Sequence, residues 1–161
     1  MSDTTGTGLR FFYFDVAHAV REHDWIIERT GGMAGTKDIG QLESPLEHIQ
    51  NDGYYPEMED KLTHLVFSIN KNHAFNDGNK RSSLVLGAYF LELNGFDYVV
   101  KRFVKEMENI VVWVADNVVG KDLLHQIISS LIYEDEYTEE IKLAIVEAAI
   151  EADKKLNQDY P

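Results

Sequence analysis

The chain has 161 residues, of which 44% are hydrophobic, and it carries a formal net charge of −13 at pH 7. This length is typical of one domain, and the hydrophobic content supplies a core, which excludes a disordered chain. The acidic charge argues against binding to nucleic acid, which requires a basic face, and favours a basic or neutral protein partner.

The chain has no cysteine, which excludes a disulfide framework and thiolate metal sites and fits a cytoplasmic location. The opening stretch MSDTTGTGLR lacks the apolar run of a signal peptide. No later run approaches the length of a transmembrane helix, so we expect no membrane partner.

The first half of the chain is predicted to be helical. Apolar residues at helical spacing predict a helix over 13–30, which the paired glycines of TGGMAG end. The connector over 36–50 leads into a short helix with Pro45 in its first turn. A third helix is predicted over 57–70, and a polar segment follows it.

The second half is predicted to be helical as well, and FDYVV at 96–100 is read as a short strand or extended link. Further helices are expected over 80–93, closed by Asn94-Gly95, then over 103–119 and 121–133, with a last acidic helix within 134–161. The residues expected in the core are Trp25, Leu62, Val66, Ile69, Leu84, Leu86, Phe90 and Trp113.

The polar segment NKNHAFNDGNKR, which begins at Asn70, lies between two apolar helices and carries the most chemistry. Asp77 and Gly78 stand just before a predicted helix, whose first N–H groups and dipole attract anions such as phosphate. Lys80 and Arg81 add positive charge there, and Asp77 could hold a divalent cation that bridges phosphates. His73 is the nearby group whose ordinary pKa suits a general base.

Each of these residues also has a purely structural interpretation. Asp77 could cap a helix, Asp-Gly-Asn is common in turns, and a single histidine before a turn is usually a surface or core residue. The combination at fixed spacing favours chemistry: a base, a metal ligand and a phosphate site together indicate transfer of a phosphorus group to a hydroxyl. Phe75 is expected to anchor the segment in the core.

The sequence HAFNDGNKR resembles the signature of the Fic/Doc family, H-x-F-x-(D/E)-G-N-G-R-x-x-R, and within it the Doc (death-on-curing) branch, which has Lys in place of the second Gly. The segment HDWIIERTGGMAGTKDIGQLESPLEHI, before the motif, and FLELNGFDYVV, after it, are also similar to Doc-type segments. The resemblance covers residues 23–132.

The resemblance implies an all-α fold, a Fic-like helical bundle with a small β-hairpin flap within 35–43. It implies ATP (a nucleoside triphosphate) and Mg²⁺ as cofactors. The family roles carried onto this chain are a catalytic base at His73, a Mg²⁺ ligand at Asp77, and phosphate contacts from Gly78, Asn79 and Arg81, with Lys80 beside them.

Two departures from the Fic pattern bear on the reaction. Lys80 replaces a glycine, and Leu84 replaces the final arginine. Doc-type members with this lysine are kinases that deliver the γ-phosphate to an elongation factor, so the favoured interpretation is a toxin-like enzyme that phosphorylates a protein hydroxyl (Ser, Thr or Tyr). The retained Gly78 keeps Fic-type AMP transfer as an alternative, and a catalytically idle binding module is the other.

Organisation and partners complete these expectations. A Fic/Doc domain is predicted over 1–133 and an acidic helix or tail over 134–161, which matches nothing in the family. Doc-type proteins are usually held by a small antitoxin, so such a partner is expected, and homo-oligomer formation is left open. His18 and His23 do not fall on one helical face and so make a poor metal pair. The other histidines, His48, His64 and His125, are read as isolated surface or packing residues.

Overall fold

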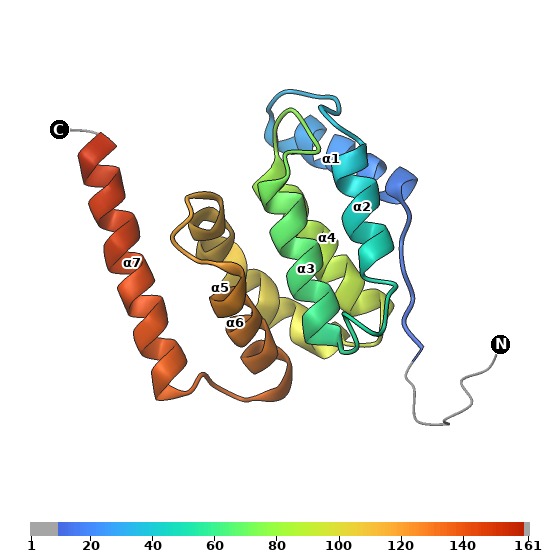
Figure 1. Cartoon of the computed structure of the whole chain (residues 1–161). Helices are drawn as coiled ribbons and strands as arrows, with labels where there is room; N and C mark the ends of the chain where they lie inside the picture. Colours follow the sequence, from blue (N-terminus) through green and yellow to red (C-terminus); the bar gives the residue numbers. More distant parts are fainter. Residues whose placement is uncertain (1–9, 160–161) are drawn as a thin grey trace.

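The computed structural model describes residues 10–159, so the N-terminal stretch examined for a signal peptide and the last two residues lie outside it. The described chain is all helical, as predicted (Figure 1). None of its helices combines the length and apolar character that a membrane crossing requires. The helices are α1 (Val16–Thr30), α2 (Gly40–His48), α3 (Met58–Lys71), α4 (Asn79–Leu93), α5 (Asp97–Ala115), α6 (Lys121–Tyr133) and α7 (Glu139–Asp159).

Helix α3 is the centre of the bundle and contacts α2, α4, α5 and α6. It begins with a capping box in which Glu57 and Asp60 satisfy each other's backbone N–H groups. Most of its apolar residues are fully buried and recur at helical spacing, and α4, whose Leu86 and Phe90 are also fully buried, packs against it. This packing places the end of α3 beside the start of α4. The predicted core residues Leu62, Val66 and Ile69 are buried.

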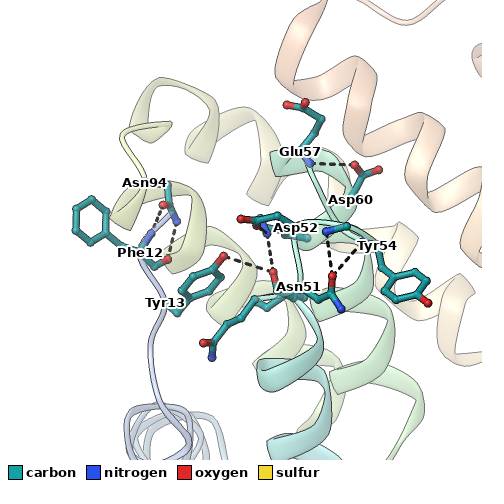
Figure 2. A network of polar contacts seen from close by, with 12 residues as sticks. Phe12, Tyr13, Asn51, Asp52, Tyr54, Glu57, Asp60 and Asn94 are labelled. Carbon is teal, nitrogen blue, oxygen red and sulfur yellow. Dashed lines mark hydrogen bonds and ion pairs between the residues drawn. The ribbon is translucent and has the colours of Figure 1, made fainter. Parts of the chain in front are cut away.

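Residues 10–15 form an extended segment that lies across the bundle rather than the first turn of α1. The backbone of Phe12 donates to and accepts from the side-chain amide of Asn94, and the Tyr13 hydroxyl donates to the carbonyl of Ile49 (Figure 2). Asp15 then caps α1 by accepting from His18 N–H. The helix therefore starts three residues later than the apolar pattern predicted.

The expected β-hairpin flap is wrong for the described residues. The only extended pairing there is a single bridge between Thr36 and Phe75. Asp38 accepts from the N–H of Gly40, which turns the chain into α2, so half of the expected flap is helix. A hairpin needs two strands that pair with each other, whereas this segment pairs with the motif loop instead.

Three other expectations fail for local reasons. FDYVV is the first turn of α5, with Asp97 near the positive end of the helix dipole, because a short run of β-branched residues does not distinguish strand from helix. Trp25 is 50% exposed, and the Arg29 guanidinium lies 4.2 Å from its ring centroid. Leu84 is only partly buried against the core.

Helix α7 packs along one side of the bundle, against α5 and α6 (Figure 1). Ile141 and Ala148 are its buried contacts, and the Lys155 ammonium donates to the carbonyl of Asp116 at the end of α5. The helix starts at Glu139, after a turn, rather than at the beginning of the predicted tail.

Candidate active site

The loop between α3 and α4 is anchored in the core by Phe75, as predicted. Phe75 is fully buried. The side chain of Asn79 holds the loop closed, because its amide nitrogen donates to the Phe75 carbonyl (3.0 Å) and its oxygen accepts from the Phe75 N–H (3.2 Å). Asn79 was predicted to contact phosphate, and that role stays a prediction. Here its amide shapes the loop.

Gly78 turns the chain from this loop into α4. Its φ of 77° and ψ of 19° lie in the left-handed region that glycine adopts without steric penalty. A Cβ atom there would lie 3.1 Å from the Ile27 side chain and 3.4 Å from the Arg81 guanidinium. The first internal bond of α4 is donated by Ser82 to the Gly78 carbonyl. The preceding N–H groups at the start of α4 are therefore available to an anion.

The carboxylate of Asp77 stands at this helix start and is half exposed. One oxygen accepts from the N–H of Gly78 (2.8 Å) and the other from the N–H of Met33 (3.1 Å). These two bonds, the Met33 bond foremost, lower the pKa of the Asp77 carboxyl below its ordinary value. The group is therefore anionic at neutral pH, as a cation ligand must be.

Arg81 is tied to the end of α1. Its guanidinium donates to the Thr30 hydroxyl and to the Gly31 carbonyl (2.9 Å), and it lies 3.8 Å from the Asp77 carboxylate. The adjacent Gly32 has a φ of 119°, and a Cβ there would lie 2.7 Å from an Asp77 oxygen. The double glycine after α1 therefore lets the backbone approach both charged residues.

His73 lies at the other end of the loop. Its side chain is exposed, and its backbone has a φ of 53°, which is uncommon for a residue with a Cβ. A cavity of about 270 Å³ extends from His73 to the start of α4. Its lining contains every predicted site residue, together with the ends of α3 and α5: Asn70, His73, Asn76, Asp77, Gly78, Asn79, Lys80, Arg81 and Ala115.

The donor set suits Mg²⁺ held jointly with a substrate. Asp77 supplies one half-exposed carboxylate, and the described residues contain no group of three or more His, Cys, Asp or Glu that could enclose a metal. Mg²⁺ commonly takes one or two carboxylates and completes its shell with phosphate oxygens and water. The site therefore fits a metal whose shell a bound substrate completes, and does not fit a closed structural metal centre built from the described residues.

Sequence reasoning missed the groups that support this loop from α1. His23, which was considered only as one half of a poor metal pair with His18, is fully buried, and its ring stacks on Phe75 with centroids 3.8 Å apart and planes 3° from parallel. Its Nε2 lies 2.6 Å from the carbonyl oxygen of Asp77. The signal available in the sequence was the position of His23 on the apolar side of α1, one turn before Ile27.

A second group of residues, which lines no part of this cavity, also escaped prediction. His48 Nδ1 lies 3.1 Å from His64 Nε2, and His64 Nδ1 lies 2.7 Å from the Lys121 ammonium. Burial, then the charge of Lys121, then His48 lower the pKa of His64 to about 4. These histidines were expected to be isolated, and no pattern within one helix reveals a contact made between three.

Comparison with known proteins gives relatives of one kind. The model of the Fic/DOC family matches residues 13–91. The chain is 38% identical over 77 residues to "Protein kinase doc" of Escherichia phage P1, a match that covers 45% of this chain and 60% of that protein. It is 33% identical over 89 residues to "Toxin Doc" of Mycolicibacterium smegmatis, covering 53% of this chain and 68% of that protein.

The matched residues include α1, α2, α3, most of α4 and the loop between α3 and α4, so they contain His73, Asp77 and Arg81. The match spans less than two thirds of the phage protein, and α7 lies beyond the family model. The shared part therefore contains all of the cavity lining except Ala115, and by these matches the chain belongs to the Fic/DOC family.

Proposed function

We propose that this protein is a Doc-type toxin that transfers a phosphate from a nucleoside triphosphate to a hydroxyl of a target protein. The observation that carries the proposal is the single cavity that brings His73, Asp77, Lys80 and Arg81 to the N-terminus of α4. The names of the two relatives, a protein kinase and a toxin, agree with it.

In the proposed reaction, the oxygen of the target hydroxyl attacks the γ-phosphorus, and His73 takes the proton from that hydroxyl. The new O–P bond forms as the bond from the γ-phosphorus to the bridging oxygen breaks, and the nucleoside diphosphate leaves. The N–H groups at the start of α4, with Lys80 and Arg81, bind the phosphates. Mg²⁺ bound by Asp77 would neutralise negative charge on the phosphates.

Lys80 favours the γ-phosphate over the adenylyl group as the transferred unit. Its exposed side chain lines the cavity at the helix start, where a glycine would leave room for two further phosphates. Added bulk and charge there favour a nucleotide seated in the opposite sense, with its γ-phosphate toward His73. We propose a translation elongation factor as the target and a small antitoxin as the partner that blocks the site, both by analogy with the Doc branch.

The proposal is tested by incubating the full chain and cell extract with ATP labelled at the α- or the γ-position, in parallel reactions with Mg²⁺. We expect protein label from γ-labelled ATP only, and none with His73→Ala. Label from α-labelled ATP would indicate AMP transfer instead. If the reaction is AMP transfer, Lys80→Gly should change the amount of protein label little. If it is phosphate transfer, Lys80→Gly should lower the label from γ-labelled ATP. An intact Mg·ATP complex without any transfer would favour a binding module.

A further inference from the structure

His23 makes a polar contact with the candidate site from the buried side of the loop. It lies on α1, more than fifty residues before Asp77. A carbonyl oxygen only accepts hydrogen bonds, so the 2.6 Å contact requires a proton on His23 Nε2. The other ring nitrogen, Nδ1, lies 3.4 Å from the carboxylate of Asp24.

The peptide that accepts this bond carries the groups that face the candidate site. It joins Asp77 to Gly78, and the position that a Cβ of Gly78 would occupy lies 3.5 Å from His23 Nε2. On the exposed side, the carboxylate of Asp77 accepts from the N–H groups of Met33 and Gly78. The peptide and the carboxylate are thus held from opposite sides, and a rotation of the peptide would move both the carboxylate and the Gly78 N–H.

The His23 ring also holds the loop through its contact with Phe75. Its parallel stack on Phe75 places two planar rings in contact, and both side chains are fully buried. Stacking alone would be satisfied by a phenylalanine, since that contact uses only the ring faces. A phenylalanine would, however, leave the carbonyl of Asp77 without its donor on the side that faces the buried ring. The two contacts of His23 can therefore be separated by substitution.

We propose that His23 is a positioning residue that sets the orientation of the Asp77–Gly78 peptide, and through it the metal- and phosphate-binding groups. The proposal rests on the proposed function for its catalytic consequence. The positioning itself is a property of the free protein. A residue that only packs would affect the stability of the fold and leave the properties of each folded molecule unchanged.

Two variants separate donor from ring. His23→Phe keeps the stacked ring and removes the donor, whereas His23→Gln keeps an N–H donor of similar reach and removes the ring. His18→Phe is a matched control, because His18 is also on α1 and stacks on an aromatic ring, that of Tyr89, with centroids 4.3 Å apart. The side-chain contacts of His18 in the described structure are with Phe14, Glu22 and Tyr89, none of which lies in the motif loop.

The first measurement needs no ligand. Amide hydrogen exchange at Asp77 and Gly78 should accelerate at least tenfold in His23→Phe, well below its melting temperature, and stay near the parent value in His23→Gln and His18→Phe. In the parent, NMR of the ring nitrogens should find Nε2 protonated. Unchanged loop exchange in His23→Phe, or a proton on Nδ1 alone, would overturn the proposal whatever the enzyme's reaction.

The second measurement uses γ-labelled ATP and extract. His23→Phe should raise the half-saturating Mg²⁺ concentration by roughly 10–100-fold, the usual effect of removing a residue that orients a metal ligand, and His23→Gln should restore most of the loss. Equal Mg²⁺ dependence in His23→Phe and the parent would sink the proposal. If the parent transfers no label, the proposed function fails, and the exchange measurement still decides the role of His23.

Discussion

The loop between α3 and α4 and the helix α7 differ in how the rest of the chain holds them. The loop is polar and its face toward the cavity is exposed, yet Phe75, Asp77 and Arg81 each contact α1 or the double glycine that follows it. Helix α7 is apolar on two sides, and Val146 and Ile150 remain more than half exposed. The comparison shows that a polar segment can be held by more contacts from other elements than an apolar helix is. Local hydrophobicity alone does not indicate how firmly a segment is held.

The difference has a consequence for function. The supported loop lies within the residues that match the Fic/DOC family, and α7 lies outside them. We therefore expect substitutions in the loop to change the transfer activity with little change in the free energy of unfolding. Substitutions in the α3–α4 core should change the free energy of unfolding. Changes in α7 should have little effect on either quantity.

The largest expected effect comes from His73→Ala. His73 is exposed, so its loss should leave the melting temperature unchanged while removing the general base, which contributes typically 10²–10⁴-fold to rate. The measurement is transfer of γ-label to target protein at saturating Mg·ATP. His125→Ala, a histidine that contacts Asp60, is the control. Equal transfer by His73→Ala and the parent would contradict the assignment.

Asp77→Ala and Arg81→Ala should each weaken Mg·ATP binding at least tenfold, with only the Asp77 effect dependent on Mg²⁺. Titration calorimetry with and without Mg²⁺ measures this. Because the pKa of the Asp77 carboxyl is lowered, its charge should persist as pH falls from 7 to 5, and this group should cause no loss of binding in that range. Unchanged affinity in both variants would place the phosphate site elsewhere.

Phe90→Ala or Leu62→Ala should lower the free energy of unfolding by roughly 2–5 kcal/mol, because both side chains are fully buried. The matched change in α7, Ile150→Ala, removes a half-exposed side chain and should stay within about 0.5 kcal/mol. Denaturant unfolding compares the three. A large loss for Ile150→Ala would show that α7 is held as firmly as the core.

The free energy of unfolding should also fall as pH drops from about 6.5 toward 4. His64 has a folded pKa of about 4, below its ordinary 6.5, so the unfolded chain binds more protons in this window and acid favours unfolding. The His64 contribution is complete above pH 6.5. His64→Gln should flatten this part of the stability profile, while His125→Gln should not. If the free energy of unfolding of His64→Gln followed pH in parallel with that of the parent, His64 would not be the group responsible.

The smallest expected effect on turnover comes from ending the chain after Tyr133. This removes α7 and its Lys155 contact with the end of α5, next to Ala115 in the cavity wall. We expect turnover on a given target to be kept, and solubility or partner choice to change. Calorimetry with Mg·ATP is the check: lost nucleotide binding would make α7 part of the site and overturn the predicted division at 133/134.

Sequence alone determined the elements whose signals are local. The apolar spacing of α3 and α4, the glycines after α1 and the motif from His73 to Arg81 each act within one or two turns, and they predicted the helices and the lining of the cavity. Element ends were less certain, because a cap such as Asp15 and a short β-branched run such as FDYVV are ambiguous without their surroundings.

Only the tertiary structure decided which distant groups meet. The bond from His23 to Asp77, the Met33 N–H on the same residue and the contact between His48 and His64 join segments that no periodicity relates. Pairing of 35–37 with the motif loop likewise replaced the expected hairpin, because backbone groups bond to the partner that folding brings near. Local spacing thus gathered the predicted site residues into one loop, and packing between helices specified their orientation.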